Sequence, residues 1–181
     1  MLLSTPRVVL RRFRAADVAA FAAYRSDPEV ARYQSWSAPV PLAVAAALVE
    51  EFAAGDPLAP GGFQYALALR SDPALIGDVY VGLHENRMQA DIGFTLAPAH
   101  QGHGYAAEAV RRVLEHLFTE RGLHRVSAEC DARNLRSARL LDRLGFRREG
   151  HRVAHTWIKG EWTDDLLFGL LAEHWRRRPA L

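Results

Sequence analysis

Residues 90–118, ADIGFTLAPAHQGHGYAAEAVRRVLEHLF, decide how this chain folds. The first part predicts a strand, because apolar residues alternate there with small or polar ones. The apolar residues are Ile92, Phe94 and Leu96, and those between them are Asp91, Gly93 and Thr95. The second part predicts a helix, because its apolar residues recur at helical spacing. They are Ala106, Ala109, Val110, Val113, Leu114, Leu117 and Phe118, and Gly122 follows as a typical left-handed C-cap.

A loop that carries two glycines joins the predicted strand to the helix. Its sequence is Gln101-Gly102-His103-Gly104-Tyr105-Ala106. The first amides of a helix have no partners within it, and the helix dipole favours an anion there. Glycine lets a phosphate approach the backbone closely, and no acidic residue stands between Leu96 and Ala107. The loop therefore predicts a diphosphate-binding site.

Two other interpretations of this loop compete with a diphosphate site. Gly102 and Gly104 could simply turn the chain. Together with Ala107 they also fit the dinucleotide fingerprint G-x-G-x-x-A. That fingerprint normally opens the first strand–helix unit of a doubly wound domain, whereas here about half of the chain precedes it. The context excludes the dinucleotide interpretation.

Three motifs in order resemble the GNAT acetyltransferase family. Gln101, Gly104 and Ala106 match its Q/R-x-x-G-x-G/A signature. Residues 134–138 (NLRSA) and 144–146 (LGF) resemble its N-x-x-S and L-G-F segments. Leu10-Arg11, residues 27–33 (DPEVARY) and residues 160–164 (GEWTD) resemble the RimJ/RimL-like branch, which acetylates the N-termini of ribosomal proteins. The likeness extends over essentially the whole chain.

The resemblance implies a fold and a co-substrate. The fold is α+β, with a mixed, mostly antiparallel sheet and helices on both faces. The strand that holds residues 91–96 splays from the strand at 126–130, and acetyl-CoA lies between them. The loop from Gln101 through Gly102, His103, Gly104 and Tyr105 to Ala106 holds the diphosphate. The pantetheine arm bonds the backbone of Phe94, Thr95 and Leu96, and Asn134 bonds the cofactor or shapes its turn.

The rest of the chain gives an order of elements consistent with this fold. Further strands are predicted at 8–13, 63–69, 75–83 and 125–130, with two last strands around the Lys159-Gly160 turn. Helices are predicted at 17–24, briefly after Asp27-Pro28, at 42–52 and at 137–144. The arginines of the first strand are expected to face water, and Asp17 is expected to cap or open its helix.

Composition narrows the class of protein. A chain of 181 residues suits one domain, 1–181, and can bury a sizeable core. The net charge of +2 gives no support for a nucleic-acid partner. A single cysteine excludes an internal disulfide and fits a reducing compartment, and no run is long and apolar enough to span a bilayer. We expect a cytoplasmic protein without a membrane or nucleic-acid partner, and a homodimer is compatible with exposed terminal strands.

Transfer of an acetyl group from a thioester to an amine needs a neutral amine and stabilisation of the carbonyl oxygen. The resemblance assigns the second task to a backbone N–H near Leu96. The first candidate for the general base is Asp91, five residues before Leu96, where several members of the family place a Glu. Asp91 could equally be the polar end of a strand, and Asp78 on the previous strand is the reserve candidate.

The residue that would protonate the leaving thiolate differs from the commoner family pattern. Many members place a Tyr four residues before the G-F pair, but this chain has Leu141 there, which donates no proton. Ser137, one helical turn earlier, is the available hydroxyl, although it could instead belong to the helix cap. Cys130 has no basic neighbour in sequence, which disfavours an acetyl-enzyme. The histidines show no H-E-x-x-H pattern, and no metal is expected.

Acceptor specificity is expected from the segment that covers the splayed strands, where Tyr33 and Trp36 could bind the substrate. Ordinary packing of a helix corner would explain both residues as well. The branch resemblance favours the α-amine of a protein or peptide N-terminus. A small amine such as an antibiotic, a polyamine or an amino acid is the alternative. A CoA-binding module without catalysis is a further alternative, because Leu141 replaces the usual Tyr.

Overall fold

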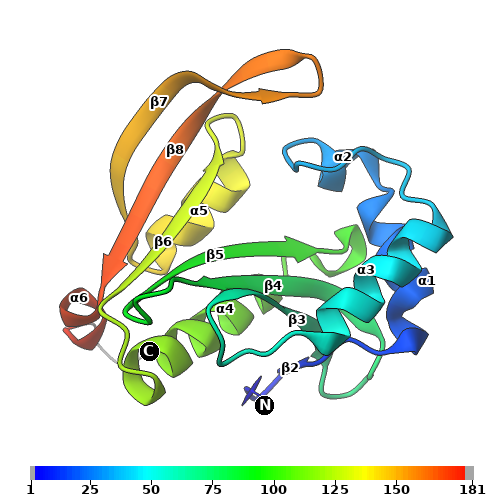
Figure 1. Ribbon diagram of the computed structural model, residues 1–181, viewed down its shortest axis with the longest axis horizontal. Coiled ribbons are helices and arrows are strands. Elements are labelled where there is room, and N and C mark those ends of the chain that lie inside the picture. The colour runs from blue at the N-terminus through cyan, green and yellow to red at the C-terminus, as the bar shows by residue number, and fades with distance from the viewer. Residues whose placement is uncertain (1–2, 178–181) are drawn as a thin grey trace.

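One eight-stranded sheet runs through the molecule, a computed structural model that describes residues 3–177 (Figure 1). Its spatial order is β1-β2-β3-β4-β5-β6-β8-β7. Neighbouring strands are antiparallel except for the parallel pair β5 and β6. The strands are β1 (Leu3–Ser4), β2 (Val8–Arg11), β3 (Gly61–Leu69), β4 (Leu75–Leu83), β5 (Gln89–Leu96), β6 (Arg125–Asp131), β7 (Arg147–Ile158) and β8 (Glu161–Leu171).

Helices cover both faces of this sheet, which confirms the predicted α+β class. The α-helices are α1 (Val18–Arg25), α2 (Pro28–Ala31), α3 (Leu42–Ala54), α4 (Tyr105–Glu115), α5 (Leu135–Arg143) and α6 (Ala172–Arg176). Short turns of other helix types are η1 (Ala15–Asp17), η2 (Pro98–His100) and η3 (His116–Glu120), the last a π-helical turn. None of the helices in residues 3–177 has the length and apolar character needed to cross a membrane.

The two faces carry separate cores. Buried residues of α4 and α5 pack with Val79, Ile92 and Val126 of the strands. Buried residues of α1 and α3 pack with Ala66 and Leu75. Successive side chains of a strand point to opposite faces, so the two clusters lie on opposite sides of the sheet. We call these sides the α4 face and the α1 face.

The sheet divides between β5 and β6. Their parallel ladder covers only three residue pairs, from Gln89↔Arg125 to Asp91↔Ser127. Beyond these pairs β6 continues beside β8, and β5 continues beside β4. Figure 1 shows β6, β7 and β8 turning away from β5 as one group. The predicted splay of these strands is therefore present.

The predicted strands and helices are present, and the structure adds short elements. Gly122 and Gly145 both have positive φ where the sequence predicted helix ends. The short elements β1 and α6 and the π turn η3 were not predicted. The prediction of one domain over 1–181 stays a prediction, and it includes residues 1–2 and 178–181, which lie outside the described part of the chain.

The expectation that the arginines of the first strand face water is wrong for Arg11. Its side chain is buried, and its two terminal nitrogens bond the carboxylate of Asp17 at 2.7 and 2.8 Å. Asp17 also accepts the backbone N–H of Arg14 at 2.8 Å, and it makes no side-chain cap bond to α1. A buried carboxylate needs a partner of opposite charge, and Arg11 supplies the matching fork. The ion pair therefore holds the residues that precede α1 in place, and Arg11 does not face solvent.

Candidate active site

The predicted anion loop has an open backbone. Gly102 and Gly104 have φ of +83° and +82°, in the left-handed region, and Gly104 is the N-cap of α4. A Cβ placed on Gly102 would meet no atom within 4 Å, and one on Gly104 would meet only the Arg7 side chain at 3.4 Å. The loop therefore presents unobstructed backbone at a helix N-terminus, as a diphosphate site requires.

Arg7 brings a positive charge to this loop. Its Nη1 donates to the His103 carbonyl at 3.1 Å, and its Nε bonds Glu108 at 2.6 Å. Burial raises the pKa of Glu108, but hydrogen bonds from Thr5 and Arg7 outweigh it and leave that pKa below the usual range. The one acid in the first turn of α4 is thus paired with a cation. Arg7 carries no local sequence signal for this role, because it lies 96 positions away from His103.

Gln101 connects the loop to both splayed halves of the sheet. Its Nε2 donates to the Leu96 carbonyl at 2.9 Å, at the end of β5. Its Oε1 accepts from Arg136 of α5 at 3.1 Å. The predicted loop, the end of β5 and the start of α5 therefore meet at one place. The exposed guanidinium of Arg136 adds a second cation there.

The backbone of β5 faces the divergence at the predicted positions. The N–H of Ala97 donates to the Ile76 carbonyl on the β4 side at 2.8 Å. Successive residues of a strand direct their backbone groups to opposite sides, so those of Phe94 and Leu96 point away from β4. The ladder to β6 ends at Asp91, and in the described residues these groups have no strand partner. Apart from the Leu96 carbonyl, which accepts from Gln101, they form an open edge that a pantetheine arm or an oxyanion could use.

The start of α5 holds the two other predicted cofactor residues. Asn134 is the N-cap, and its side chain accepts the backbone N–H of Ser137 at 3.1 Å. The capping role weighed for Ser137 therefore uses its backbone, and its half-buried hydroxyl makes no hydrogen bond within residues 3–177. Leu141 is 1% exposed and packs in the core. Ser137 is thus the free hydroxyl on this turn.

The reserve base Asp78 lies buried on the α1 face. It is 1% exposed, and its carboxylate bonds the Tyr24 hydroxyl, the Gln64 amide and, at 3.4 Å, Arg25. Burial raises the pKa of Asp78, against the lowering effects of Arg25 and the hydrogen bonds. By contrast the side chain of Asp91 is 56% exposed and bonds His84 at 2.9 Å. Asp91 shares the α1 face, at the last β5–β6 pair.

The predicted acceptor residues lie between α2 and α3. Trp36 is half-buried, donates its indole N–H to the Arg25 carbonyl at 3.0 Å and lies against the Arg25 guanidinium at 4.0 Å. The packing alternative therefore describes Trp36 well. Tyr33 lies beside Arg133, whose guanidinium is 5.8 Å from its ring centroid. Arg133 in turn bonds Glu161 of β8 at 2.9 Å.

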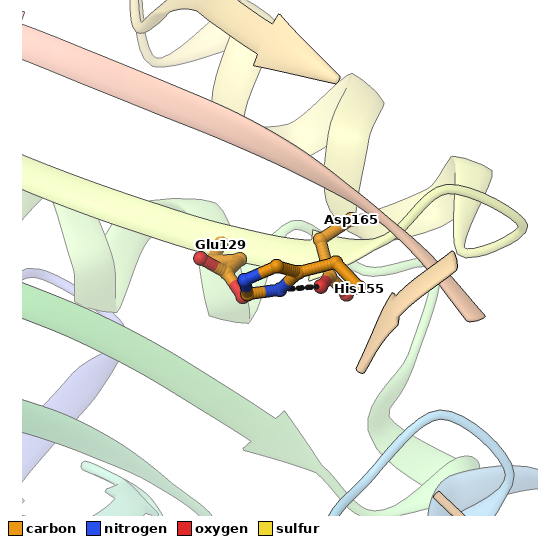
Figure 2. A group of neighbouring side chains, drawn as sticks. All are labelled: Glu129, His155 and Asp165. Atoms are coloured by element: carbon orange, nitrogen blue, oxygen red, sulfur yellow. Dashed lines mark hydrogen bonds and ion pairs between the residues drawn. The ribbon is translucent and has the colours of Figure 1, made fainter. Parts of the chain in front are cut away.

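One group of side chains in the described residues could hold a cation. Glu129, His155 and Asp165 point toward one another (Figure 2), and one ligand atom from each lies within 4.8 Å of the others. The His155 Nδ1 atom lies 2.9 Å from Asp165, which also accepts the Thr156 hydroxyl at 2.6 Å. The expectation of no metal stays a prediction. No local sequence motif links these residues, because they come from three different strands, β6, β7 and β8.

Comparison with known proteins establishes the class. Residues 7–147 match the family model described as acetyltransferase (GNAT) domain, so this chain belongs to the GNAT acetyltransferases. It is 29% identical to the uncharacterized N-acetyltransferase YnaD of Bacillus subtilis over 97% of this chain and 99% of that protein. A GNAT acetyltransferase structure from Bacillus anthracis superposes with a TM-score of 0.86 at 26% identity, covering 96% of this chain and 99% of that one. The chain is an acetyl-CoA-dependent N-acetyltransferase, and the non-catalytic alternative is not favoured.

Two relatives with a named acceptor match less than half of this chain in sequence. The [ribosomal protein uS5]-alanine N-acetyltransferase of Escherichia coli is 32% identical over 46% of this chain and 43% of that protein. The spermidine N(1)-acetyltransferase of Vibrio cholerae is 33% identical over 41% of this chain and 43% of that protein. A spermidine N-acetyltransferase from the same organism, in complex with CoA and spermine, shares the fold with a TM-score of 0.80 at 21% identity, covering 96% and 100% of the two chains. These matches do not distinguish the two acceptor classes.

Proposed function

We propose that this enzyme acetylates the α-amine of a protein or peptide N-terminus, as the RimJ/RimL-like branch does. We assign the diphosphate of acetyl-CoA to the amides from Gly102 to Ala106, with Arg7 beside them. The pantetheine arm takes the backbone groups of β5 near Phe94 and Leu96. Gln101 holds the loop against Leu96, and Asn134 shapes the turn before Ser137.

One juxtaposition carries the proposal for the acceptor. The two segments that resemble the branch, 27–33 and 160–164, meet in space although they stand at opposite ends of the sequence. Lys159, next to the second segment, donates to the Ala31 carbonyl of the first, across 128 positions. Arg133 contacts both Tyr33 and Glu161. We assign to these contacts an aromatic and polar rim for the acceptor, which suits an extended peptide end.

The chemistry of such an acceptor matches the groups that the site offers. An α-amine has a pKa of about 8 and is partly neutral already, whereas a lysine-like amine near 10.4 needs stronger deprotonation. The amine attacks the thioester carbonyl, and a backbone N–H near Leu96 stabilises the oxygen as charge builds on it. Ser137 then protonates the departing thiolate. A thiol pKa of about 8.5 makes this last assistance modest.

A panel of amines tests the acceptor. Acetyl-CoA and the parent protein are mixed with lysine-free peptides that begin with Ala, Ser or Met, with N-blocked peptides that contain lysine, and with spermidine. We expect CoA thiol release above the no-amine background only with free N-termini, and fragment masses that place the acetyl group on the α-amine. Turnover with spermidine and none with the free peptides would identify a small-amine acetyltransferase instead.

A further inference from the structure

A bulge in β7 directs one histidine onto a buried carboxylate. The pairing of β7 with β8 shifts register between Arg152 and Thr156. Ala154 within this bulge has a φ of +47°, and its N–H is held by Asp164 at 2.8 Å. Left-handed backbone is costly for a residue with a Cβ, and bulges often redirect a side chain beside an active site. Here the redirected side chain is His155.

His155 and Asp165 form an oriented pair. The Nδ1 atom of His155 lies 2.9 Å from Asp165 Oδ2, and the Asp165 side chain is 7% exposed. Thr156 donates its hydroxyl to the same carboxylate oxygen at 2.6 Å. A carboxylate on one ring nitrogen fixes the tautomer and leaves the other nitrogen as the acceptor. The imidazole is about half exposed, at 48%, so that second nitrogen is accessible.

This pair lies on the α1 face, beside the start of α5. In the ladder between β6 and β8, Asp165 lies opposite Asp131, the last residue of β6. Asp131 accepts the N–H of Asn134, and Asn134 accepts the N–H of Ser137. Val126 and Ala128 face the core under α5, so Glu129, Asp131 and Asp165 share the opposite face. The acetyl group would thus have Ser137 on one side of β6 and His155 on the other.

The other two acid–base candidates are less available. Asp78 is buried, and Tyr24, Gln64 and Arg25 occupy its carboxylate. Asp91 is exposed at the last β5–β6 pair, five residues before Leu96. At about 3.3 Å per residue that separation is roughly 16 Å along the strand. His155 is accessible and oriented, and its nitrogen away from Asp165 is available to accept a proton.

We propose that His155, held by Asp165, is the general base that accepts the proton of the attacking amine. The amine nitrogen forms its bond to the thioester carbonyl carbon while one N–H proton moves to the free ring nitrogen of His155. The carbon–sulfur bond then breaks, and the CoA thiolate takes one proton from Ser137, which regains a proton from water. His155 returns its proton to solvent. Glu129, whose carboxylate lies within 4.8 Å of the imidazole, attracts the cationic amine to this place.

The test compares His155→Gln with the parent protein, using the amine that the parent acetylates fastest in the panel above. The proposal rests on amine acetylation but not on which amine is accepted, so failure of the peptide proposal leaves this test intact. We expect kcat to fall by roughly 10²-fold or more, the usual contribution of a positioned base, with acetyl-CoA affinity unchanged. Asp165→Asn should give a smaller loss, because the imidazole remains but loses its orientation.

The pH dependence provides a second readout. The charged groups facing the imidazole are Asp165 on β8, Glu129 on β6 and Arg152 on β7, which lies 3.4 Å from Glu129. As the pH falls, the kcat/KM of the parent should decrease because two groups become protonated, the amine and the base. His155→Gln should retain only the ionisation of the amine. Titration with acetyl-CoA and the thermal midpoint verify folding, and Asp165→Asn carries the test if His155→Gln does not fold.

His151→Gln is the matched control. His151 is also on β7 and bonds a neighbouring carboxylate, Asp164, at 2.7 Å, with 40% of its side chain exposed. Its variant should retain parental turnover and pH profile. The proposal is overturned if His155→Gln stays within twofold of the parent, or if Asp91→Asn instead loses the ionisation of the base. It is also overturned if a chelator abolishes parental activity and Zn²⁺ restores it, because the three residues would then be metal ligands.

Discussion

The two sides of the diverging strands β5 and β6 are built differently. On the α4 face, the site consists mainly of backbone: the glycine loop before α4 and the unpaired edge of β5. On the α1 face, it consists of side chains from distant segments, such as Lys159 on Ala31 and His155 on Asp165. A diphosphate offers the same atoms in every acetyl-CoA, whereas acceptors differ. Backbone therefore suits the constant substrate, and exchangeable side chains suit the variable one.

The largest expected effect tests whether the loop backbone binds acetyl-CoA. Gly102→Val puts a β-branched residue at a φ of +83°. A left-handed residue with a Cβ costs about 1–2 kcal/mol, and relief of that strain moves the loop amides, so acetyl-CoA affinity should fall by about fivefold to thirtyfold. Isothermal titration with acetyl-CoA measures the change.

Gly122→Val is the control for this variant. Gly122 also has a positive φ, of +68°, and a Cβ there meets no atom within 4 Å, but it follows the end of the α4–η3 helix. Both variants should lose similar stability in thermal unfolding. Only Gly102→Val should lose acetyl-CoA affinity. Equal losses of affinity would show that general destabilisation, and not the loop, explains the effect.

A smaller effect is expected from Ser137→Ala, which separates chemistry from capping. Only the backbone N–H of Ser137 bonds Asn134, so removal of the hydroxyl leaves the cap intact. Turnover should fall by about tenfold, which is less than a general acid usually contributes, because thiolate is a tolerable leaving group. Acetyl-CoA affinity should change little. Steady-state kinetics and a binding titration measure the two quantities.

Asn134→Ala makes the complementary change. It removes the N-cap of α5 and should lower the free energy of unfolding by about 1 kcal/mol. Ser137→Ala should leave that free energy unchanged. If Ser137→Ala instead destabilises the protein and leaves turnover intact, Ser137 is structural and the thiolate departs without assistance.

The contrast between the two sides also explains what could be predicted. The strand, loop and helix of residues 90–118 were predicted because their signals are local: alternation, two glycines and helical spacing. The motif around Gln101 and the segment from Asn134 then identified the family, and with it the splay. The π turn His116–Glu120 was missed, because one added residue barely changes the apolar pattern.

The α1 face could not be predicted in the same way. The β7 bulge contains no glycine, and Ala154 gives no sign that its φ is positive. Arg11 was expected in solvent, because an alternating strand pattern does not reveal that Asp17 would bury it. His155, Asp165 and Glu129 are brought together only by strand order and register. Such contacts depend on long-range pairing, which no local motif records.

A further prediction asks whether the rim on the α1 face acts on the acceptor alone. Lys159→Met removes the bond to the Ala31 carbonyl between α2 and the β7–β8 turn. A typical hydrogen bond contributes about 1 kcal/mol net, so the acceptor KM should rise by about fivefold. The KM for acetyl-CoA should not change. A rise in the acetyl-CoA KM would contradict the division between the two faces.

The smallest expected effect concerns Cys130, which lies on β6 between the two sides. Burial, and then the charges of Asp131 and Asp165, raise the pKa of its thiol to about 11. At pH 8 this pKa leaves the thiolate fraction roughly 10²-fold below that of an ordinary cysteine near 8.5. The thiol should therefore react slowly with iodoacetamide, and speed up as pH approaches 11. Cys130→Ala should retain turnover within twofold, as direct attack by the amine requires. An acetylated Cys130, detected by mass spectrometry after incubation with acetyl-CoA alone, would contradict direct attack and make β6 part of the chemistry.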